Sequence, residues 1–440
     1  MLRSPAIGAD APYSTHVNPQ WVRLLNLLEM NVRYERCLGA ELFTTDGRRI
    51  LDFLSGYCVH NTGHNHPDIV AALQRELEGY GPAMLQSHVP ELAGELAQRL
   101  CERAGGRLTK VSFCSSGSEG VETAIKFSRA HTGRAGLLYA HGAFHGLTCG
   151  ALSLMGDAFW REGFGPLLPG TEAVPFGSLE DLQERLSTRR FAAFMVEPVQ
   201  AEAGIRVPEP GYPREAQALC RRYGTLLVLD EVQTGMYRTG RFLAAHHFGL
   251  EPDIVILAKA LSGGLIPVGA VLMSDEIYNS VYGSLKRAIV RSGLATLDVL
   301  ERGRLGERAS SFGAALRGRL TEALSGFEMV KEVRGLGMLS GIEFAAPRQL
   351  RLRIAFETFR KIHPGMFGQV LVMRLFRDRN IPTQIRGNNF LVLKVAPPLV
   401  VSEAQLDEFV SAIRDVIEEV HSSNTFWSEA LSLAGRAINI

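Results

Sequence analysis

The sequence predicts an α/β protein with a large, doubly wound, mainly parallel sheet and a second, smaller α+β domain. Between residues 110 and 275, short apolar runs alternate with amphipathic segments, which is the pattern of strands joined by helical crossovers. The runs are nearly continuous in apolar residues, as expected for strands that helices cover on both faces. After Gly335 the pattern changes, and 440 residues are enough for more than one core.

Six apolar runs predict the strands of the large sheet. They are VSFC (111–114), GLLYA (136–140), FAAFMVEPV (191–199), TLLVLDEV (225–232), DIVILAK (253–259) and VGAVLMS (268–274). Helices are predicted over GVETAIKFSRA and over PREAQALCRRYG, which a glycine terminates. Downstream, RGLGMLSGIEF predicts a turn that enters a strand, FLVLKVAPP predicts another strand, and SEAQLDEFVSAIRDVIEEV predicts a helix capped by its serine.

Three parts of the chain are expected from these elements. Residues 1–60 form an N-terminal segment that joins the small domain, residues 61–325 form the large domain, and residues 326–440 form the C-terminal small domain.

Composition and charge exclude several classes of partner. The formal net charge is +1, so no basic excess indicates nucleic acid or an acidic membrane surface. The longest apolar runs are only strand-length, and residues 1–20 lack the apolar stretch of a signal peptide. Six scattered cysteines without a C-x-x-C pair indicate reduced thiols. We expect a cytoplasmic protein that binds neither nucleic acid nor membrane.

The first candidate site lies where the run at 111–114 ends. SSGSEGVETAIKF leaves that strand and opens a helix, so Gly117 and Ser118 are expected at a helix N-terminus. Free N–H groups and the helix dipole favour a phosphate there, and glycine allows close approach. The alternative is that Ser-Gly-Ser only caps the helix.

Two charged residues end other runs. Asp230 and its neighbour Glu231 stand at the carboxyl end of a buried parallel strand, where α/β proteins bind ligands. The alternative is an aspartate that caps the next loop. Lys259 ends DIVILAK, and apolar surroundings would lower its pKa and provide a neutral amine nucleophile. The alternative is a lysine whose ammonium reaches solvent.

Together these features indicate a phosphorylated pyridine aldehyde as cofactor. Its phosphate needs a cradle, its aldehyde needs an amine, and its ring nitrogen needs a carboxylate to hold the proton that makes the ring an electron sink. Phe144, in HGAFHG, is available to cover one ring face. The sequence therefore predicts that Ser118, Asp230 and Lys259 converge around a single ring.

The same residues belong to a series of motifs that resembles the class III (ω-) aminotransferases, a group of fold type I pyridoxal-5′-phosphate (PLP) enzymes. The resemblance runs from about Tyr34 to Glu419. It includes DFLSGYCVHNTGHNHP (52–67), SGSEGVETAIK (116–126), GAFHG (142–146), EPVQAEAG (197–204), LDEVQTGMYRTG (229–240), LAKALSGG (257–264), VRGLGMLSGIEF (333–344) and KVAPPL (394–399).

The resemblance implies a role for each matching residue. Lys259 would form the Schiff base and transfer protons, Asp230 would pair with the pyridinium nitrogen, and Gln233 would meet the phenolic oxygen. Val232 would pack on the ring face opposite Phe144. The other cofactor residues expected from these motifs are Ser116, Gly117, Ser118, His145 and Glu197.

Within the family, GAFHGLTCGAL, LLPG and VPFG look closest to putrescine- and ornithine-type members. Tyr57 matches a substrate-contacting tyrosine, and Glu202 matches the glutamate that masks a cationic partner in ω-amine enzymes. That partner is here Lys394 where many members have arginine, so carboxylate recognition is expected to be looser. Leu147 replaces an arginine of ornithine-type members, which argues against a substrate carboxylate gripped there.

A larger departure follows Val290. The family continues through roughly a dozen residues with a threonine that binds the cofactor phosphate of the neighbouring subunit, whereas here the chain runs directly into RSGLATLDVLE. The sequence leaves open whether this is a true deletion or an omitted stretch.

The resemblance implies a homodimer that moves a terminal amino group from a diamine or ω-amino acid to a 2-oxo acid by ping-pong kinetics, with 2-oxoglutarate as the expected acceptor. An aminomutase or racemase on the same fold is the alternative enzyme, and the need for an external amino acceptor separates the two. A dimeric scaffold with impaired cofactor binding is a third hypothesis. The amine donor stays open.

The histidines of GHNHP (63–67) and HGAFHG lack the spacing of a helical or finger-type zinc site, so no metal is predicted. His64 and His66 are expected to stabilise a loop near the dimer contact.

Overall fold

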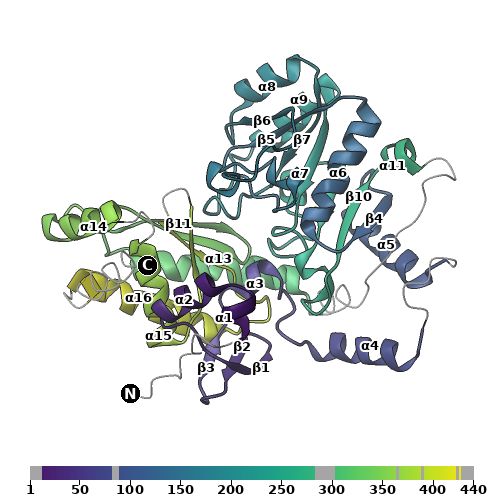
Figure 1. Ribbon diagram of the computed structural model, residues 1–440. Coiled ribbons are helices and arrows are strands. Elements are labelled where there is room, and N and C mark those ends of the chain that lie inside the picture. Colours follow the sequence, from purple (N-terminus) through teal and green to yellow (C-terminus); the bar gives the residue numbers. More distant parts are fainter. Residues whose placement is uncertain are drawn as a thin grey trace.

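The computed structural model describes residues 12–81, 89–282, 303–362, 366–387, 391–422 and 426–427. Figure 1 shows two lobes, one built around a large twisted sheet and the other around the first and last parts of the described chain. The departure after Val290 lies outside the described residues. Within those residues, no helix has the length and apolar character needed to cross a membrane.

A seven-stranded sheet forms the centre of the larger lobe. Its order is β4 (Lys110–Cys114), β10 (Gly269–Met273), β9 (Ile254–Leu257), β8 (Leu226–Asp230), β7 (Phe191–Val196), β5 (Gly136–Ala140) and β6 (Thr171–Val174). Neighbouring strands are parallel except that β10 runs antiparallel to β4 and β9. The six predicted strands are confirmed, although β7, β8 and β9 end earlier than predicted. Strand β6 was not predicted, because its four residues are mostly half-buried and give no continuous apolar run.

Helices cover both faces of this sheet. The helices in this part of the chain are α4 (Pro67–Glu78), which lies away from the sheet in Figure 1, and α5 (Glu91–Ala104), α6 (Gly117–Thr132), α7 (Cys149–Leu152), η1 (Ala158–Trp160), α8 (Leu179–Ser187), α9 (Tyr212–Tyr223), α10 (Ala245–Phe248), η2 (Lys259–Ser262) and α11 (Asp275–Tyr282). Alternate strand residues face opposite layers: Val228 packs in the cluster that contains Val121 of α6, whereas Leu227 packs in the cluster that contains Ala216 of α9. By this alternation Asp230 shares the α6 face.

The smaller lobe brings the two ends of the described chain together. Its elements are α1 (Pro12–His16), α2 (Pro19–Leu27), β1 (Tyr34–Leu38), β2 (Glu41–Thr44), β3 (Arg49–Leu51), α3 (Ser55–Cys58), α13 (Leu305–Leu324), β11 (Val330–Leu336), β12 (Leu339–Phe344), α14 (Leu350–Ile362), α15 (Met366–Arg379), β13 (Gln384–Arg386), β14 (Val392–Val395) and α16 (Glu403–Ser422). The strands form two sheets, β1-β2-β3 and β11-β12-β14-β13. Ser402 caps α16 as predicted, because its hydroxyl accepts from Gln405 N at 3.2 Å.

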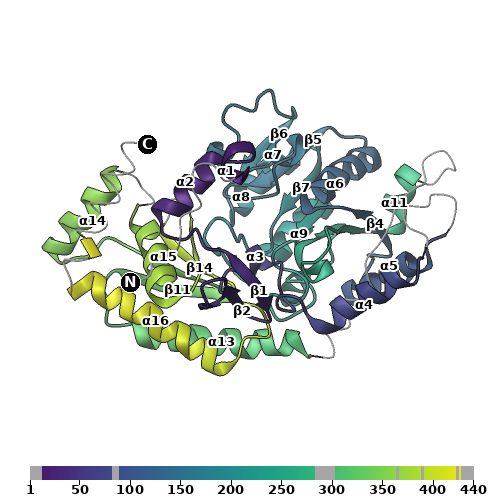
Figure 2. The same cartoon turned by 60° about the horizontal axis from the view of Figure 1, so that its bottom comes forward.

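Contacts across this lobe join segments that are far apart in sequence, as Figure 2 shows for β1, β2 and α16. Ile50 of β3 packs with Phe376 of α15, and the ring of Phe53 stacks on Phe409 of α16 with centroids 4.3 Å apart. The N-terminal strands therefore pack on the C-terminal helices. The domain boundaries at residues 60 and 325 stay a prediction.

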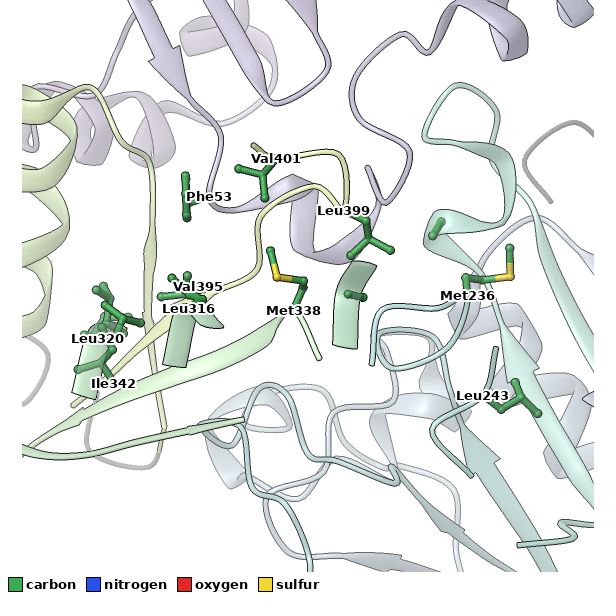
Figure 3. Close-up of a cluster of buried hydrophobic side chains, with 14 of the residues drawn as sticks. Phe53, Met236, Leu243, Leu316, Leu320, Met338, Ile342, Val395, Leu399 and Val401 are labelled. Atoms are coloured by element: carbon green, nitrogen blue, oxygen red, sulfur yellow. The ribbon is translucent and has the colours of Figure 1, made fainter. Parts of the chain in front are cut away.

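The two lobes share one continuous apolar core. Figure 3 shows buried side chains of Phe53, Met236, Met338 and Leu399 in the same cluster, and these come from four separate segments. Burial of apolar surface is the main favourable contribution to folding, so the lobes stabilise each other.

A buried guanidinium lies at the same junction. Arg238, which follows β8, has no exposed surface. Its Nη1 donates to Pro397 O at 2.5 Å and to Met338 O at 3.4 Å. Its Nη2 donates to Asn61 Oδ1 at 2.5 Å and to Ser55 Oγ at 3.2 Å. These four acceptors belong to the N-terminal and C-terminal segments, so one side chain ties both to the large lobe.

One of those segments contains an unusual turn. The four residues of α3 (Ser55–Cys58) all have left-handed backbone angles, with φ values of 53°, 55°, 62° and 71°. Only Gly56 adopts this conformation without penalty, since the left-handed region costs an L-residue about 1–2 kcal/mol. Asp52 stabilises the turn, because its Oδ1 accepts from Leu54 N at 2.8 Å and from Ser55 N at 2.7 Å.

We expect Arg238→Met to lower the free energy of unfolding by about 3 kcal/mol or more, because four buried acceptors would lose their donor. Arg221→Met is the matched control, since Arg221 is half-exposed and pairs only with Glu251 at the surface. Thermal unfolding of both variants checks this. Equal melting temperatures for the two variants would contradict it.

Candidate active site

A cavity of about 500 Å³ opens at the carboxyl ends of β7 and β8 and at the N-terminus of α6. Ligands of α/β sheets bind at this edge. All ten residues predicted to bind the cofactor line it: Ser116, Gly117, Ser118, Phe144, His145, Glu197, Asp230, Val232, Gln233 and Lys259. The predicted convergence of Ser118, Asp230 and Lys259 on one cavity is therefore found, while the role of each residue stays a prediction.

The N-terminus of α6 is built as an anion cradle. Ser116 Oγ accepts from Glu119 N at 3.2 Å, and Glu119 Oε2 accepts from Ser115 N at 2.6 Å. These caps leave the first N–H groups of the helix, those of Gly117 and Ser118, without an intrahelical partner. Such groups favour a phosphate.

Two glycines keep the cradle open. A Cβ on Gly117 would lie 3.0 Å from Val232 Cγ2, and a Cβ on Gly146 would lie 2.2 Å from Ser118 Oγ. Gly146 also has a φ of 122°, a conformation that side chains disfavour. A side chain at either glycine would therefore collide with a neighbouring residue of the cavity.

Asp230 is held in one orientation. Its Oδ2 lies 2.8 Å from His145 Nδ1, and its Oδ1 accepts from Val232 N at 3.0 Å. The side chain of His145 is fully buried, and its Nε2 has no hydrogen-bond partner in the described part of the chain. A carboxylate fixed by a buried imidazole can hold a proton on a ring nitrogen.

The neighbouring carboxylate has a structural role. Glu231 Oε1 accepts from Ala245 N at 2.8 Å, and Oε2 accepts from Ala244 N at 3.0 Å. Burial raises the pKa of Glu231 to about 7. The sequence pair Asp-Glu therefore separates into one acid that lines the cavity and one that holds a loop.

Lys259 begins η2 directly after β9 and has a φ of 48°. Left-handed backbone at a lysine is unfavourable and is typical of functional sites. Burial lowers the pKa of Lys259, Asp230 opposes this shift, and the positive charge of Lys394 adds to it. The neutral amine is therefore easier to form at this position than at an exposed lysine.

Glu197 connects two loops of the cavity. Its Oε1 accepts from Phe144 N at 3.0 Å, and its Oε2 accepts from Ala201 N at 3.1 Å. Burial raises the pKa of Glu197 to about 7; Asp230 adds to this rise and His145 opposes it. The ring of Phe144 meets Trp160 edge-on, with centroids 5.3 Å apart.

Gln233 links the cavity to a buried charged cluster. Lys394 Nζ donates to Gln233 Oε1 at 2.7 Å and lies 2.9 Å from Glu202 Oε1, and Gln233 Nε2 donates to the same glutamate oxygen at 3.2 Å. Lys394, in the middle of β14, has no exposed surface. We call these three residues the Lys394 triad. The predicted substrate residues Glu202 and Lys394 are thus in direct contact.

Tyr57, the third predicted substrate residue, lies beside the Lys394 triad. Its ring centroid is 5.8 Å from Lys394 Nζ, within cation–π range. The next residue, Cys58, is buried with its sulfur 4.0 Å from Gln233 Oε1. Tyr57, Glu202 and Lys394 therefore form a second cluster that shares Gln233 with the cavity.

Some cavity residues were not predicted. They are Val59, Ser115, Gly146, Thr234, Ala258, Ser262, Gly264, Leu265, Ile266, Pro267 and Val268. The sequence did contain a signal for residues 264–268. They belong to LSGGLIPVG, which follows Lys259 closely and contains two adjacent glycines that are typical of a turn. Their apolar side chains carry no chemistry of their own, so sequence reasoning passed over them.

The two predicted histidines have structural partners. His64 Nε2 lies 2.6 Å from Asp52 Oδ2, and His66 caps α4 by accepting from Asp68 N at 3.3 Å. Across the described residues, no group of three or more His, Cys, Asp or Glu is placed to hold a metal ion.

The cavity fits PLP. It offers an anion cradle that a Cβ would fill, an amine with a lowered pKa, and a fixed carboxylate. These are the groups that the phosphate, aldehyde and ring nitrogen of that cofactor require.

Comparison with known proteins gives a consistent result. A family model for aminotransferase class III matches residues 26–417. The chain is 36% identical over 452 aligned positions to aminotransferase PigE of Serratia sp. (strain ATCC 39006), an alignment that covers 93% of this chain and 53% of PigE. The chain thus spans about half the length of that relative.

Two solved structures are similar over most of their length. The ornithine aminotransferase of Toxoplasma gondii has a TM-score of 0.79 and 29% identity, covering 89% of this chain and 91% of that chain. An (S)-enantioselective ω-transaminase of Thermomicrobium roseum has a TM-score of 0.77 and 30% identity, covering 91% and 95%. A further structure of the Toxoplasma enzyme contains PLP at partial occupancy in its active site.

We expect Gly117→Ala to weaken PLP binding by about tenfold, because the new Cβ would force the cradle away from Val232. Gly94→Ala is the control, since a Cβ there meets nothing within 4 Å. Titration of the apoenzymes with PLP measures both. Equal affinities would contradict the cradle.

We also expect Lys394→Met to change how PLP attachment depends on pH. The positive charge of Lys394 lowers the pKa of Lys259, so removing Lys394 raises that pKa. A higher pH is then needed to form the same fraction of neutral Lys259 amine. The pH midpoint for covalent attachment of PLP to the apoenzyme should therefore move upward, as followed by absorbance. Lys110→Met, at a half-exposed ion pair on β4, should leave it in place. A midpoint that moves downward, or not at all, would count against this electrostatic link.

Proposed function

Because the chain belongs to the class III aminotransferases, whose cofactor is PLP, we propose that it transfers a terminal amino group from a diamine or an ω-amino acid to a 2-oxo acid, with 2-oxoglutarate as acceptor. The observation that supports this choice of substrate is the ion pair between Glu202 and the fully buried Lys394.

The side chains of this protein supply binding and proton transfer. When bound, PLP supplies an aldehyde that condenses with primary amines and a ring that withdraws electrons. Lys259 Nζ acts as the amine nucleophile and as the base that takes the proton from the amine-bearing carbon of the donor and later gives a proton to the corresponding carbon of the acceptor. Asp230, fixed by His145, would hold a proton at the ring nitrogen. Phe144 and Val232, which line the cavity, would pack against the ring and exclude water.

The Lys394 triad selects the end of the substrate that reacts. In the resting protein Glu202 neutralises Lys394, so the site offers no free cation to an α-carboxylate beside the reacting amine. A terminal –CH₂NH₂ group carries no such carboxylate and enters without disturbing the triad. A 2-oxo acid must instead displace Glu202, and its carboxylate then pairs with Lys394 as a point charge.

The position that follows His145 and Gly146 carries an apolar residue in this chain. Leu147, where ornithine-type relatives carry arginine, is 57% exposed. No cation at that position grips a second carboxylate, which supports a diamine or an uncharged chain over a dicarboxylate donor.

A homodimer in the cytoplasm is part of this proposal. The dimer rests on the resemblance to the family, and the location rests on the scattered cysteines, which indicate reduced thiols.

Steady-state kinetics with a panel of amines and 2-oxoglutarate test the proposal. We expect parallel lines in double-reciprocal plots, since the first product leaves before the acceptor binds. Lys259→Ala should lower kcat by about 10²–10⁴-fold, and borohydride reduction of the wild-type protein should place a pyridoxyl group on Lys259. Intersecting lines, or modification of another lysine, would refute this mechanism. Turnover of an amine without any acceptor would indicate an aminomutase or racemase instead.

A further inference from the structure

The left-handed turn α3 (Ser55–Cys58) is strained, and its residue Tyr57 belongs to the cluster of Tyr57, Glu202 and Lys394 described above. Ser55, Tyr57 and Cys58 all have positive φ values although none is glycine. Such strain persists only where the surrounding structure imposes it, and it concentrates at functional sites. Two questions follow: which contacts hold the backbone of the turn in this conformation, and which side chains the conformation places.

The cause is a network on its N-terminal side. Asp52 Oδ1 accepts from Leu54 N and Ser55 N, and Asp52 Oδ2 is fixed by His64 Nε2 at 2.6 Å. Arg238 Nη2 donates to Ser55 Oγ at 3.2 Å. Ser55 itself is fully buried, so this hydroxyl contact is not exchanged for water.

The consequence is the placement of the last two residues of the turn. A right-handed turn would send the side chains of Tyr57 and Cys58 in other directions. In the left-handed turn the ring of Tyr57 lies 5.8 Å from Lys394 Nζ, and the sulfur of Cys58 lies 4.0 Å from Gln233 Oε1. The turn thus places two side chains against the Lys394 triad.

We propose that Ser55, tethered by Arg238, is a positioning residue for substrate binding: it keeps the left-handed turn closed and so holds the Tyr57 ring beside Lys394. Ser55 is not among the described residues that line the cavity, and its hydroxyl accepts from Arg238, so in this proposal it acts through the backbone of the turn. The inference rests on the proposed function in that its kinetic test uses a donor amine which the wild-type protein accepts.

The strain itself is tested by a matched pair of variants. Tyr57→Ala and Tyr57→Gly both remove the ring, but only glycine removes the cost of a positive φ. We expect Tyr57→Gly to melt roughly 1–3 °C above Tyr57→Ala. Gln74→Ala and Gln74→Gly, at an exposed position inside α4, should show the opposite order, since glycine destabilises a helix. A Tyr57→Gly protein that melts at or below Tyr57→Ala overturns the claim of strain.

The tether is tested by a double-mutant cycle. Ser55→Ala should raise KM for the donor amine about three- to tenfold, with kcat changed by less than about twofold, because ring placement affects binding rather than proton transfer. In the Tyr57→Ala background the same substitution should change KM by less than about 1.5-fold, since no ring remains to be placed. A residue that only stabilises the fold would show the same KM effect in both backgrounds. That outcome, or a wild-type KM in Ser55→Ala, overturns the proposal.

These results are separable from failure of the proposed function. If the wild-type protein turns over no amine, the proposed function fails, while the melting order of the Tyr57 pair still decides whether the turn is strained. If the wild-type protein is active and the cycle is additive, the function stands and the role of Ser55 falls.

Discussion

Burial of the Arg238 guanidinium is the constraint around which the junction of the two lobes is organised. A charged group without solvent must have hydrogen-bond acceptors, and here they come from Ser55 and Asn61 on one side and from Met338 and Pro397 on the other. Arg238 follows Asp230 of the cavity by eight residues. The segment that supplies this acid is therefore bonded both to the N-terminal segment and to the C-terminal segment of the smaller lobe. Misplacement of either segment would leave buried N–H groups of this guanidinium without acceptors.

The active site inherits this arrangement. The cavity is made almost entirely from the large lobe, by the ends of its strands and the start of α6, whereas Lys394 comes from β14 and Tyr57 from α3 in the smaller lobe. Gln233 belongs to the large lobe and bonds Lys394 directly. Lys394 and Tyr57 of the smaller lobe therefore meet Gln233 and Glu202 of the large lobe beside the cavity, so the expected substrate residues come from both lobes.

The sequence was sufficient for six strands of the large sheet and the helix at Gly117, because buried strands and Gly-rich turns leave strong local patterns. Most of the ten residues around the cavity were predicted from the resemblance to the family, which also singled out Asp230 over Glu231; the alternation along β8 gives the physical reason, since it places Asp230 on the α6 face. Sequence reasoning missed β6, whose residues are mostly half-buried, and the left-handed turn, which Asp52 and a contact with Arg238 some 180 residues away stabilise together. Both depend on tertiary structure, which no local window contains.

Glu197 places a limit on how this scaffold can diverge. Its two oxygens accept hydrogen bonds from the backbone of Phe144 and of Ala201, so the loop that carries Phe144 and the loop that carries Glu202 are both held by this one side chain. An insertion in either loop would pull on the other, and length changes there are expected to be rare among descendants of this sequence. The stretch Leu265–Val268 lines the same cavity without a bond to that carboxylate. Exchange of apolar side chains at these four positions can therefore change the shape of the cavity without disturbing the two loops that Glu197 holds.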